Sequence, residues 1–258
     1  MITQAQLHAN LEKINERIVE AAHKASRAPA DITLLLATKT RTPEVINEAI
    51  RLGYGLIGEN RAQELVEKAP FLIPASMPTS NKEIADITQQ SISAEAISYV
   101  TPRETHFIGA LQGNKVNEVT KLADCIQSVD RLRIARRIHQ YALDNHLQKR
   151  ILIQVNSSLD PNKQGVLPDE LPQFLEDIAS FSTLKIEGLM TIGLQTEDEK
   201  LIRQGFADLR ILSEKMRTQG LLPADATTLS MGMSGDLELA ILEGSTLLRV
   251  GSDIFGAR

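Results

Sequence analysis

The sequence predicts an α/β protein, a single (β/α)8 or TIM barrel with an extra helix before its first strand. Eight short apolar runs alternate with amphipathic segments of helical periodicity. Several runs are continuous rather than alternating, as expected for parallel strands buried on both faces. An open doubly wound sheet is the alternative, but eight strands within 258 residues favour a closed barrel.

The first segment is predicted to be an amphipathic helix. Its apolar residues recur at helical spacing on one face, and charged residues occupy the opposite face. These apolar residues are Leu7, Leu11, Ile14, Ile18 and Ala22. Because this helix precedes the first apolar run, it is an addition to the eight β-α units.

The remaining elements follow in alternation. The predicted strands are residues 32–38, 54–58, 106–110, 125–129, 151–156, 186–191, 228–231 and 247–250. The predicted helices lie near 43–51, 60–69, 114–122, 130–146, 168–180, 197–217 and 235–243. Asp130 and Ser234 stand at N-cap positions of two of these helices.

Residues 70–104 interrupt the alternation, between the second of these helices (60–69) and the third strand. The segment is rich in proline and serine and has little periodicity. Connections from helix to strand lie at the end of a barrel opposite its active site. We therefore expect an insertion that serves stability, interaction or no specific role, within one domain spanning residues 1–258.

Composition restricts the classes of partner. The net charge of −5 gives no reason to expect nucleic acid, and no apolar run approaches the length of a membrane helix. The single cysteine, Cys125, excludes an internal disulfide and favours a reducing compartment, so we expect a cytoplasmic protein in which Cys125 is a buried apolar residue. The five histidines show no metal-ligand spacing.

The last two predicted strands carry the signature of a phosphate site. Ser230 ends the seventh strand, and Gly251 and Ser252 follow the eighth. Loops after strands 7 and 8 commonly bind phosphate in (β/α)8 barrels, because they present backbone N–H groups and hydroxyls. Ordinary turn chemistry is the alternative for each segment alone, but two such segments on adjacent strands predict a phosphorylated ligand.

Lys39 ends the first predicted strand and is expected at the same mouth of the barrel. Partial burial lowers the pKa of an ammonium, and a free lysine amine can form a Schiff base with an aldehyde. The alternative is a lysine whose ammonium extends into solvent from a strand end.

Asn60 and Arg249 follow or end neighbouring strands at this mouth. Asn60 could hydrogen-bond a ring substituent, or it could cap the following helix. Arg249 stays protonated, so it can donate a hydrogen bond to a ring nitrogen; pairing with a carboxylate is the alternative. Lys163 follows the fifth strand and could also reach the mouth.

These residues belong to a pattern that resembles the pyridoxal 5′-phosphate homeostasis proteins, which are relatives of the N-terminal domain of alanine racemase. The matching segments are 38–40 (TKT), 58–60 (GEN), 106–115 (HFIGALQGNK), 154–156 (QVN), 163–166 (KQGV), 187–190 (EGLM), 229–234 (LSMGMS), 243–246 (EGST), 249–251 (RVG) and 255–258 (FGAR). The resemblance implies that Lys39 holds pyridoxal 5′-phosphate (PLP) as a Schiff base. It also implies that Ser230, Gly251 and Ser252 bind the phosphate, that Arg249 faces the pyridine nitrogen and that Asn60 lies beside the ring.

The chain departs from the family pattern away from these residues. Ala110 stands where the family usually has histidine, Gly113 where serine is common, and Gly235 where an acidic or small residue is usual. The insertion is also longer than the family norm. These departures concern the loop after the third strand and any partner surface there.

The sequence favours a PLP carrier over an enzyme. An arginine at the pyridine nitrogen weakens the ring as an electron sink, and racemisation needs a base on each face of the substrate carbon. None of the tyrosines, Tyr54, Tyr99 and Tyr141, is predicted at the mouth. We therefore expect a monomeric protein of PLP (vitamin B6) homeostasis and supply, whose partners are PLP and PLP-dependent apo-enzymes. The alternatives are a weak racemase using Lys163 or a partner's residue as second base, and a cofactor-free Schiff-base aldolase.

Overall fold

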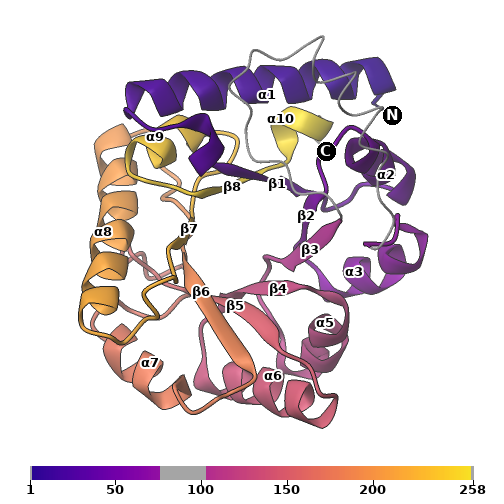
Figure 1. Ribbon diagram of the computed structural model, residues 1–258. Coiled ribbons are helices and arrows are strands. Elements are labelled where there is room, and N and C mark those ends of the chain that lie inside the picture. The colour runs from indigo at the N-terminus through magenta and orange to yellow at the C-terminus, as the bar shows by residue number, and fades with distance from the viewer. Residues whose placement is uncertain (1, 76–102, 257–258) are drawn as a thin grey trace.

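The computed structural model describes residues 2–75 and 103–256. Its strands are β1 (Thr33–Ala37), β2 (Leu56–Glu59), β3 (Glu104–Phe107), β4 (Cys125–Val129), β5 (Lys149–Gln154), β6 (Leu184–Met190), β7 (Thr228–Ser230) and β8 (Leu247–Val250). They are parallel and pair in chain order, and β8 pairs with β1 to close the barrel (Figure 1). The predicted fold class is therefore confirmed.

The helices surround the barrel, as Figure 1 shows. They are α1 (Gln4–Lys24), α2 (Pro43–Arg51), α3 (Ala62–Lys68), α5 (Val116–Leu122), α6 (Leu132–Asp144), α7 (Leu171–Ile178), α8 (Glu199–Thr218), α9 (Leu237–Leu242) and α10 (Ser252–Phe255), with 3-10 turns at Pro29–Asp31, Ala69–Phe71 and Gly113–Lys115. Each predicted helix between strands is present, and α10 is an additional short helix after β8.

The N-terminal helix α1 begins with a capping box, in which Thr3 and Gln6 bond each other's backbone N–H groups. The apolar stripe predicted from the sequence is buried. This stripe packs α1 against α9 and α10, the last helices of the chain (Figure 1). The extra helix thus covers the region where the barrel closes.

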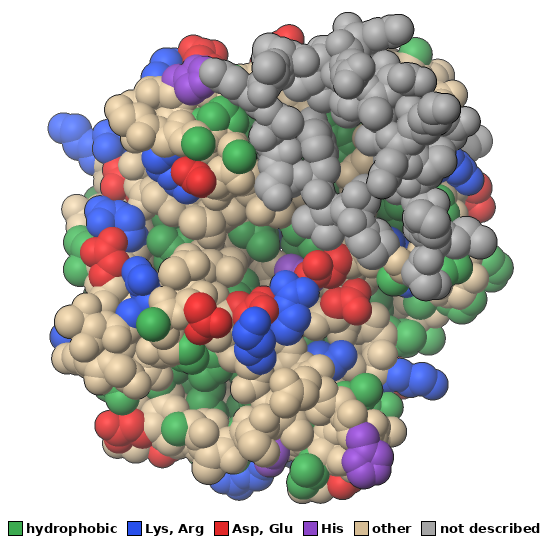
Figure 2. Space-filling model, viewed as in Figure 1, with side chains coloured by type: hydrophobic (Ala, Val, Ile, Leu, Met, Phe, Trp, Pro, Cys, Tyr) green, Lys and Arg blue, Asp and Glu red, His purple; other side chains and the backbone are tan. Residues whose placement is uncertain are grey.

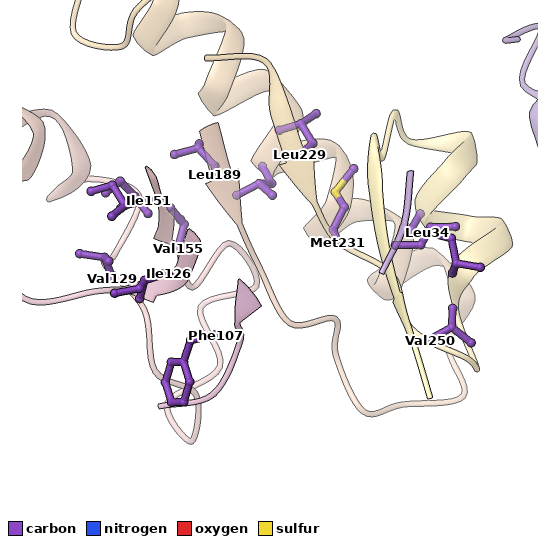
Figure 3. Packing of buried hydrophobic residues seen from close by; sticks show 14 of the residues in the cluster. Leu34, Phe107, Ile126, Val129, Ile151, Val155, Leu189, Leu229, Met231 and Val250 are labelled. Atoms are coloured by element: carbon purple, nitrogen blue, oxygen red, sulfur yellow. The ribbon is translucent and has the colours of Figure 1, made fainter. Parts of the chain in front are cut away.

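The core has two parts because successive residues of a strand point to opposite sides. The larger part lies between strands and helices and contains Leu34, Phe107 and Leu229 (Figure 3). The barrel interior holds smaller apolar groups, including Leu35 with Leu56 and Leu247, and Cys125 with Leu152 and Met190. Burial raises the pKa of the Cys125 thiol, which confirms the prediction of a buried apolar residue.

Most of the predicted insertion, residues 76–102, lies outside the described residues. Its two described ends lie together, since the Arg103 guanidinium donates to the Ile73 carbonyl at 2.8 Å. The Asn47 side chain of α2 holds the first end by bonding the Phe71 carbonyl and the Ile73 N–H, both at 2.8 Å. Glu104, expected as the last residue of the insertion, is instead the first residue of β3.

The two predicted N-caps are wrong. Helix α6 begins one residue later than expected, with Arg131 at the N-cap, and the Asp130 carboxylate pairs with the Arg131 guanidinium at 2.8 Å. Helix α9 has Asp236 at its N-cap. Asp236 accepts a hydrogen bond from the Met233 N–H at 2.5 Å, which tightens the turn and delays the start of the helix beyond Ser234.

In the described parts of the chain, every helix is too short or too polar to cross a membrane.

Candidate functional site

The carboxyl ends of β1 and β8 form a small cavity at one mouth of the barrel. The cavity has a volume of about 160 Å³ and is lined by Ala37, Lys39, Thr40, Arg41, Gly251, Ser252 and Gly256. Three of the predicted site residues, Lys39, Gly251 and Ser252, therefore lie in one place, although β1 and β8 are the first and last strands.

The Lys39 side chain is half-buried. Among residues 2–75 and 103–256, no side chain or carbonyl makes a hydrogen bond or ion pair with its ammonium group. An amine in this setting is available to react with an aldehyde.

A buried ion-pair cluster holds the backbone on both sides of Lys39. The Lys68 ammonium donates to the Thr38 carbonyl at 2.9 Å and to the carboxylates of Glu59 and Glu64, each at 2.8 Å. The Thr38 hydroxyl donates to Glu59 at 2.6 Å, and the Thr40 N–H donates to Glu64 at 2.6 Å. The segment that carries Lys39 is therefore fixed by side chains of β2 and α3.

This cluster also explains an unusual backbone conformation. Thr40 has a φ of 63°, in the left-handed region that β-branched residues seldom adopt. The hydrogen bond to Glu64 offsets that strain. Burial raises the pKa of Glu59, against the influence of Lys68 and Thr38. Burial also acts to raise the pKa of Glu64, but the bonds from Lys68 and Thr40 outweigh it and the pKa is lowered.

The Ser252 hydroxyl belongs to the same cavity, and a second hydroxyl, that of Ser234, is bonded to it. Ser252 Oγ donates to Ser234 Oγ at 2.9 Å, which joins the loop after β7 to the start of α10. The Arg17 guanidinium of α1 holds both segments, because it donates to the Ser234 carbonyl at 2.9 Å and to Asp253 at 2.7 Å. Ser234 was missing from the predicted site; the signal for it was the second serine of the 230–234 segment, following Gly232.

Gly251 permits a close approach of the two strand ends. A Cβ atom built on Gly251 would lie 2.7 Å from the Ala37 carbonyl oxygen. Any side chain would push β8 from β1, so glycine keeps the backbone N–H groups near the cavity.

Ser230 lies inside the barrel rather than beside Ser252. Its side chain is fully buried, and its hydroxyl donates to Gln127 Oε1 at 2.6 Å while accepting from Arg249 Nη1 at 2.7 Å. A phosphate-binding role for Ser230 stays a prediction. The two hydrogen bonds argue against it, because they already use the hydroxyl both as donor and as acceptor.

Arg249 is also buried, with its Nη2 donating to the Thr191 carbonyl at 2.8 Å. Its Nε makes no hydrogen bond with another described residue, and no described carboxylate forms an ion pair with it. Burial lowers the pKa of Arg249 to about 10, against the attraction of Asp236. The guanidinium therefore stays charged at neutral pH, and its Nε–H is available to a ligand.

Asn60 directly follows β2 and lines a second cavity of about 290 Å³, which also contains Phe107, Ala110 and Lys115. Its Oδ1 is buried without a partner in the described residues. The N-cap of α3 is Arg61, so capping does not account for Asn60. A buried amide oxygen with no partner is a candidate ligand contact.

The residues considered as a second base are placed less favourably. Lys163 donates to the carbonyls of Ile192, at 3.1 Å, and Gly193. Burial lowers the pKa of Lys163, against Asp160 and Asp236. Tyr54 precedes β2 and accepts a hydrogen bond from Asn15 of α1, while Tyr141 lies on α6. Tyr99 lies outside the described residues.

A larger cavity of about 560 Å³ opens at the amino ends of the strands. Figure 2 shows acidic and basic side chains gathered over the middle of the barrel. The cavity is lined by Glu104 and Arg150, which pair with each other at 2.5 Å, and Arg150 also pairs with Glu187 at 2.8 Å. Because these charges are already paired, we place the candidate site at the opposite mouth. No cluster of His, Cys, Asp and Glu among the described residues could hold a metal ion.

Comparison with known proteins gives consistent matches over almost the whole chain. The family described as "Alanine racemase, N-terminal domain" matches residues 2–258. The chain is 33% identical to the pyridoxal phosphate homeostasis protein of Pasteurella multocida, covering 98% of this chain and 97% of that protein. It is 35% identical to the protein of that name from Pseudomonas aeruginosa, covering 96% and 94%.

Solved structures match as well. A protein of unknown function from Bifidobacterium adolescentis has a TM-score of 0.80 at 33% identity, covering 99% of this chain and 98% of that one. PipY of Synechococcus elongatus, solved with PLP bound, has a TM-score of 0.71 at 29% identity, covering 93% and 100%. Alanine racemase of Clostridium difficile shares the fold, with a TM-score of 0.65 at 14% identity, covering 98% of this chain and 57% of the racemase.

Proposed function

This chain belongs to the alanine racemase N-terminal domain family, and from that premise we propose that it binds PLP as a Schiff base on Lys39 and serves PLP homeostasis rather than catalysis. Relatives that cover almost all of the chain are named pyridoxal phosphate homeostasis proteins, and the related PipY has been solved with PLP. The barrel and its insertion, residues 1–258, act as one PLP-binding domain in this proposal.

One observation carries the proposal: the Lys39 amine, which has no partner among residues 2–75 and 103–256, shares a cavity with the Gly251–Ser252 backbone and a serine hydroxyl. A ligand that carries both an aldehyde and a phosphate could react with the lysine amine and bind the backbone N–H groups and the hydroxyl at the same time. PLP has those two groups on one small ring.

The surrounding residues fit the rest of such a ligand. Within the described part of the chain, Asn60 Oδ1 is buried without a partner, and Arg249 Nε makes no hydrogen bond. Gly251 lets β8 lie close to β1 beside the cavity, because a Cβ atom there would lie 2.7 Å from the Ala37 carbonyl oxygen. Lys39 would hold the cofactor covalently, Gly251, Ser252 and Ser234 its phosphate, Arg249 its ring nitrogen, and Asn60 the edge of the ring.

The same residues favour holding the cofactor over using it. Bound PLP supplies an electron sink, which depends on a protonated ring nitrogen. Arg249 is a donor that keeps its own proton at neutral pH, so it does not protonate that nitrogen. No described tyrosine lies at the mouth, and the Lys163 ammonium is bound to two carbonyls. A racemase would need a second base that this mouth does not present among the described residues.

We extend the proposal to the setting in the cell. PLP-dependent apo-enzymes are the proposed recipients of the cofactor, and the proposed form is a monomer in the cytoplasm. The buried, unpaired Cys125 supports a reducing compartment.

The test is the visible absorption spectrum of the purified protein with added PLP, before and after borohydride. We expect a yellow band that reduction fixes to the peptide containing Lys39, and that Lys39→Ala lacks. The matched control is Lys121→Ala, an exposed lysine of α5, which should keep the band. No band in the wild type would overturn the proposal, and rapid racemisation of an amino acid would overturn its non-catalytic part.

A further inference from the structure

Five buried or half-buried polar side chains from four strands form a continuous hydrogen-bonded series inside the barrel. Arg249 of β8, Ser230 of β7, Gln127 of β4, His106 of β3 and Glu104 of β3 follow one another through hydrogen bonds. Ser230 and Gln127 are 0% exposed, His106 2% and Arg249 5%. Polar groups this deeply buried must be paired to be tolerated, so their arrangement is strongly constrained.

The direction of each bond follows from the donors available. Arg249 can only donate, so Ser230 Oγ accepts at 2.7 Å and gives its own proton to Gln127 Oε1 at 2.6 Å. The Gln127 amide nitrogen then faces His106 Nδ1 at 2.6 Å and donates to it. His106 therefore carries its proton on Nε2, which donates to Glu104 at 2.5 Å.

Reversing the Gln127 amide would break this order. Its oxygen would then require a proton on His106 Nδ1, and a neutral ring would present a bare Nε2 to the Glu104 carboxylate. With a neutral His106, only one direction of donation therefore gives every hydrogen bond in the series both a donor and an acceptor. The series ends on the Glu104 carboxylate, which also accepts a hydrogen bond from Arg150 Nη1 at 2.5 Å.

At its other end, the series sets the orientation of Arg249. The guanidinium has two fixed bonds, Nη1 to Ser230 and Nη2 to the Thr191 carbonyl, and these leave Nε as the nitrogen without a bond to a described residue. Loss of the Ser230 hydroxyl would leave a buried, charged nitrogen unpaired, so the guanidinium would turn to find another acceptor.

We propose that Ser230, Gln127 and His106 are positioning residues that aim Arg249 Nε at the ring nitrogen of the cofactor. Ser230 then acts through Arg249 and does not bind the phosphate. This inference rests on the proposed function, because it assigns a role to residues behind the same site.

The test compares three probes on wild type and Ser230→Ala: PLP, pyridoxal, which lacks the phosphate, and a PLP analogue with CH in place of the ring nitrogen. We expect Ser230→Ala to weaken PLP and pyridoxal by a similar factor, about tenfold for one lost bond to a charged group. The visible band of bound PLP should shift, and the analogue should bind wild type and variant equally.

Ser245→Ala is the matched control. Ser245 is equally buried, and its hydroxyl donates at the same distance, 2.6 Å, to the Met231 backbone carbonyl, but no hydrogen bond joins it to Arg249. It should leave the absorption band and the binding of all three probes unchanged. A purely structural effect of removing a buried hydroxyl would appear in both variants.

The outcomes separate the possibilities. A Ser230→Ala variant that loses affinity for PLP but not for pyridoxal would make Ser230 a phosphate ligand and overturn the inference. If Ser230→Ala lowered the affinity for PLP and for the analogue without a ring nitrogen by the same factor, the inference would be overturned too. If Ser230→Ala does not fold, Gln127→Met is tested with the same three probes. It should shift the visible band of bound PLP in the direction expected for Ser230→Ala. Failure of the wild type to bind PLP would instead contradict the proposed function.

Discussion

The hydroxyls of Ser234 and Ser252 lie 2.9 Å apart, although eighteen positions separate them in the chain. One follows β7 and the other follows β8, and Arg17 of α1 fastens both segments. The pair provides two hydroxyl donors where the structure also provides the Gly251 backbone.

Ser234→Ala and Ser252→Ala should each weaken PLP binding by about tenfold, because each removes a donor to a charged phosphate. Pyridoxal, which has no phosphate, should bind the variants and the wild type equally. Fluorescence or absorbance titration with both compounds measures the difference. Ser182→Ala, at an exposed position away from the mouth, is the control. If the variants lost affinity for PLP and for pyridoxal by the same factor, these serines would not be phosphate ligands.

Lys68→Met should destabilise the protein strongly, by about 3–5 kcal/mol in the free energy of unfolding, because it leaves Glu59 as an unpaired buried charge. Lys24→Met is the matched control. Lys24–Glu20 and Lys68–Glu64 are both i,i+4 pairs, but the first has side chains 65% and 69% exposed and the second 10% and 17%. The surface pair should contribute no more than about 0.5 kcal/mol.

Denaturant unfolding of both variants measures this contrast. Adding Glu59→Gln to Lys68→Met should restore part of the stability, because the unpaired charge is then gone. A double variant that is less stable than Lys68→Met would show that the buried charge is not the cause.

The two carboxylates of the cluster should respond to pH with opposite signs. The pKa of Glu64 is lowered in the folded protein, so its stabilising contribution is present above its ordinary pKa of 4.5 and is lost as the pH falls further. The pKa of Glu59 is raised by burial, so its contribution is greatest at acid pH and declines as the pH rises past 4.5.

Unfolding free energies of wild type, Glu64→Gln and Glu59→Gln across this range provide the measurement. The advantage of wild type over Glu64→Gln should shrink as the pH falls below 4.5. The stability of wild type relative to Glu59→Gln should instead decline as the pH rises. If the stability difference between wild type and variant changed with pH in the same direction for Glu64→Gln and Glu59→Gln, the opposite pKa shifts of the two carboxylates would be contradicted.

Gly251→Ala should cost about 1–3 kcal/mol of stability and weaken PLP binding, because the new Cβ would lie 2.7 Å from the Ala37 carbonyl oxygen and force β1 and β8 apart. Gly235→Ala is the control in the preceding loop, where a Cβ meets nothing within 4 Å. Its unfolding free energy should stay within about 0.5 kcal/mol of wild type. An unchanged affinity in Gly251→Ala would show that the close approach does not matter for the site.

The barrel itself could be predicted from the sequence because each parallel strand is buried on both faces and reads as an apolar run. The runs at 125–129 and 247–250 coincide with β4 and β8. Their order in the sheet needed no further information, since consecutive β-α units pair with their neighbours. Boundaries were less accurate where turns intervene, as at Tyr54, which lies before β2 and contacts α1.

The site was harder to predict because it depends on which way each side chain points. Ser230 and Ser234 belong to the same short segment, but Ser230 is the last residue of β7 and faces the interior, next to Arg249, whereas Ser234 lies in the loop that follows. A shift of one residue in the strand would reverse that orientation. The contact between Ser230 and Gln127 joins residues 103 positions apart, so only the closed barrel brings them together.

Closure of the barrel by the β1–β8 pair also sets an order of events during synthesis on the ribosome. Lys39 emerges early, whereas Ser234, Gly251 and Ser252 emerge after β6 has left. A nascent chain therefore exposes Lys39 before the residues proposed to bind a phosphate have been synthesised. If the chain binds PLP as proposed, selective binding must follow closure of the barrel, because only the folded chain brings Lys39 beside Gly251 and Ser252.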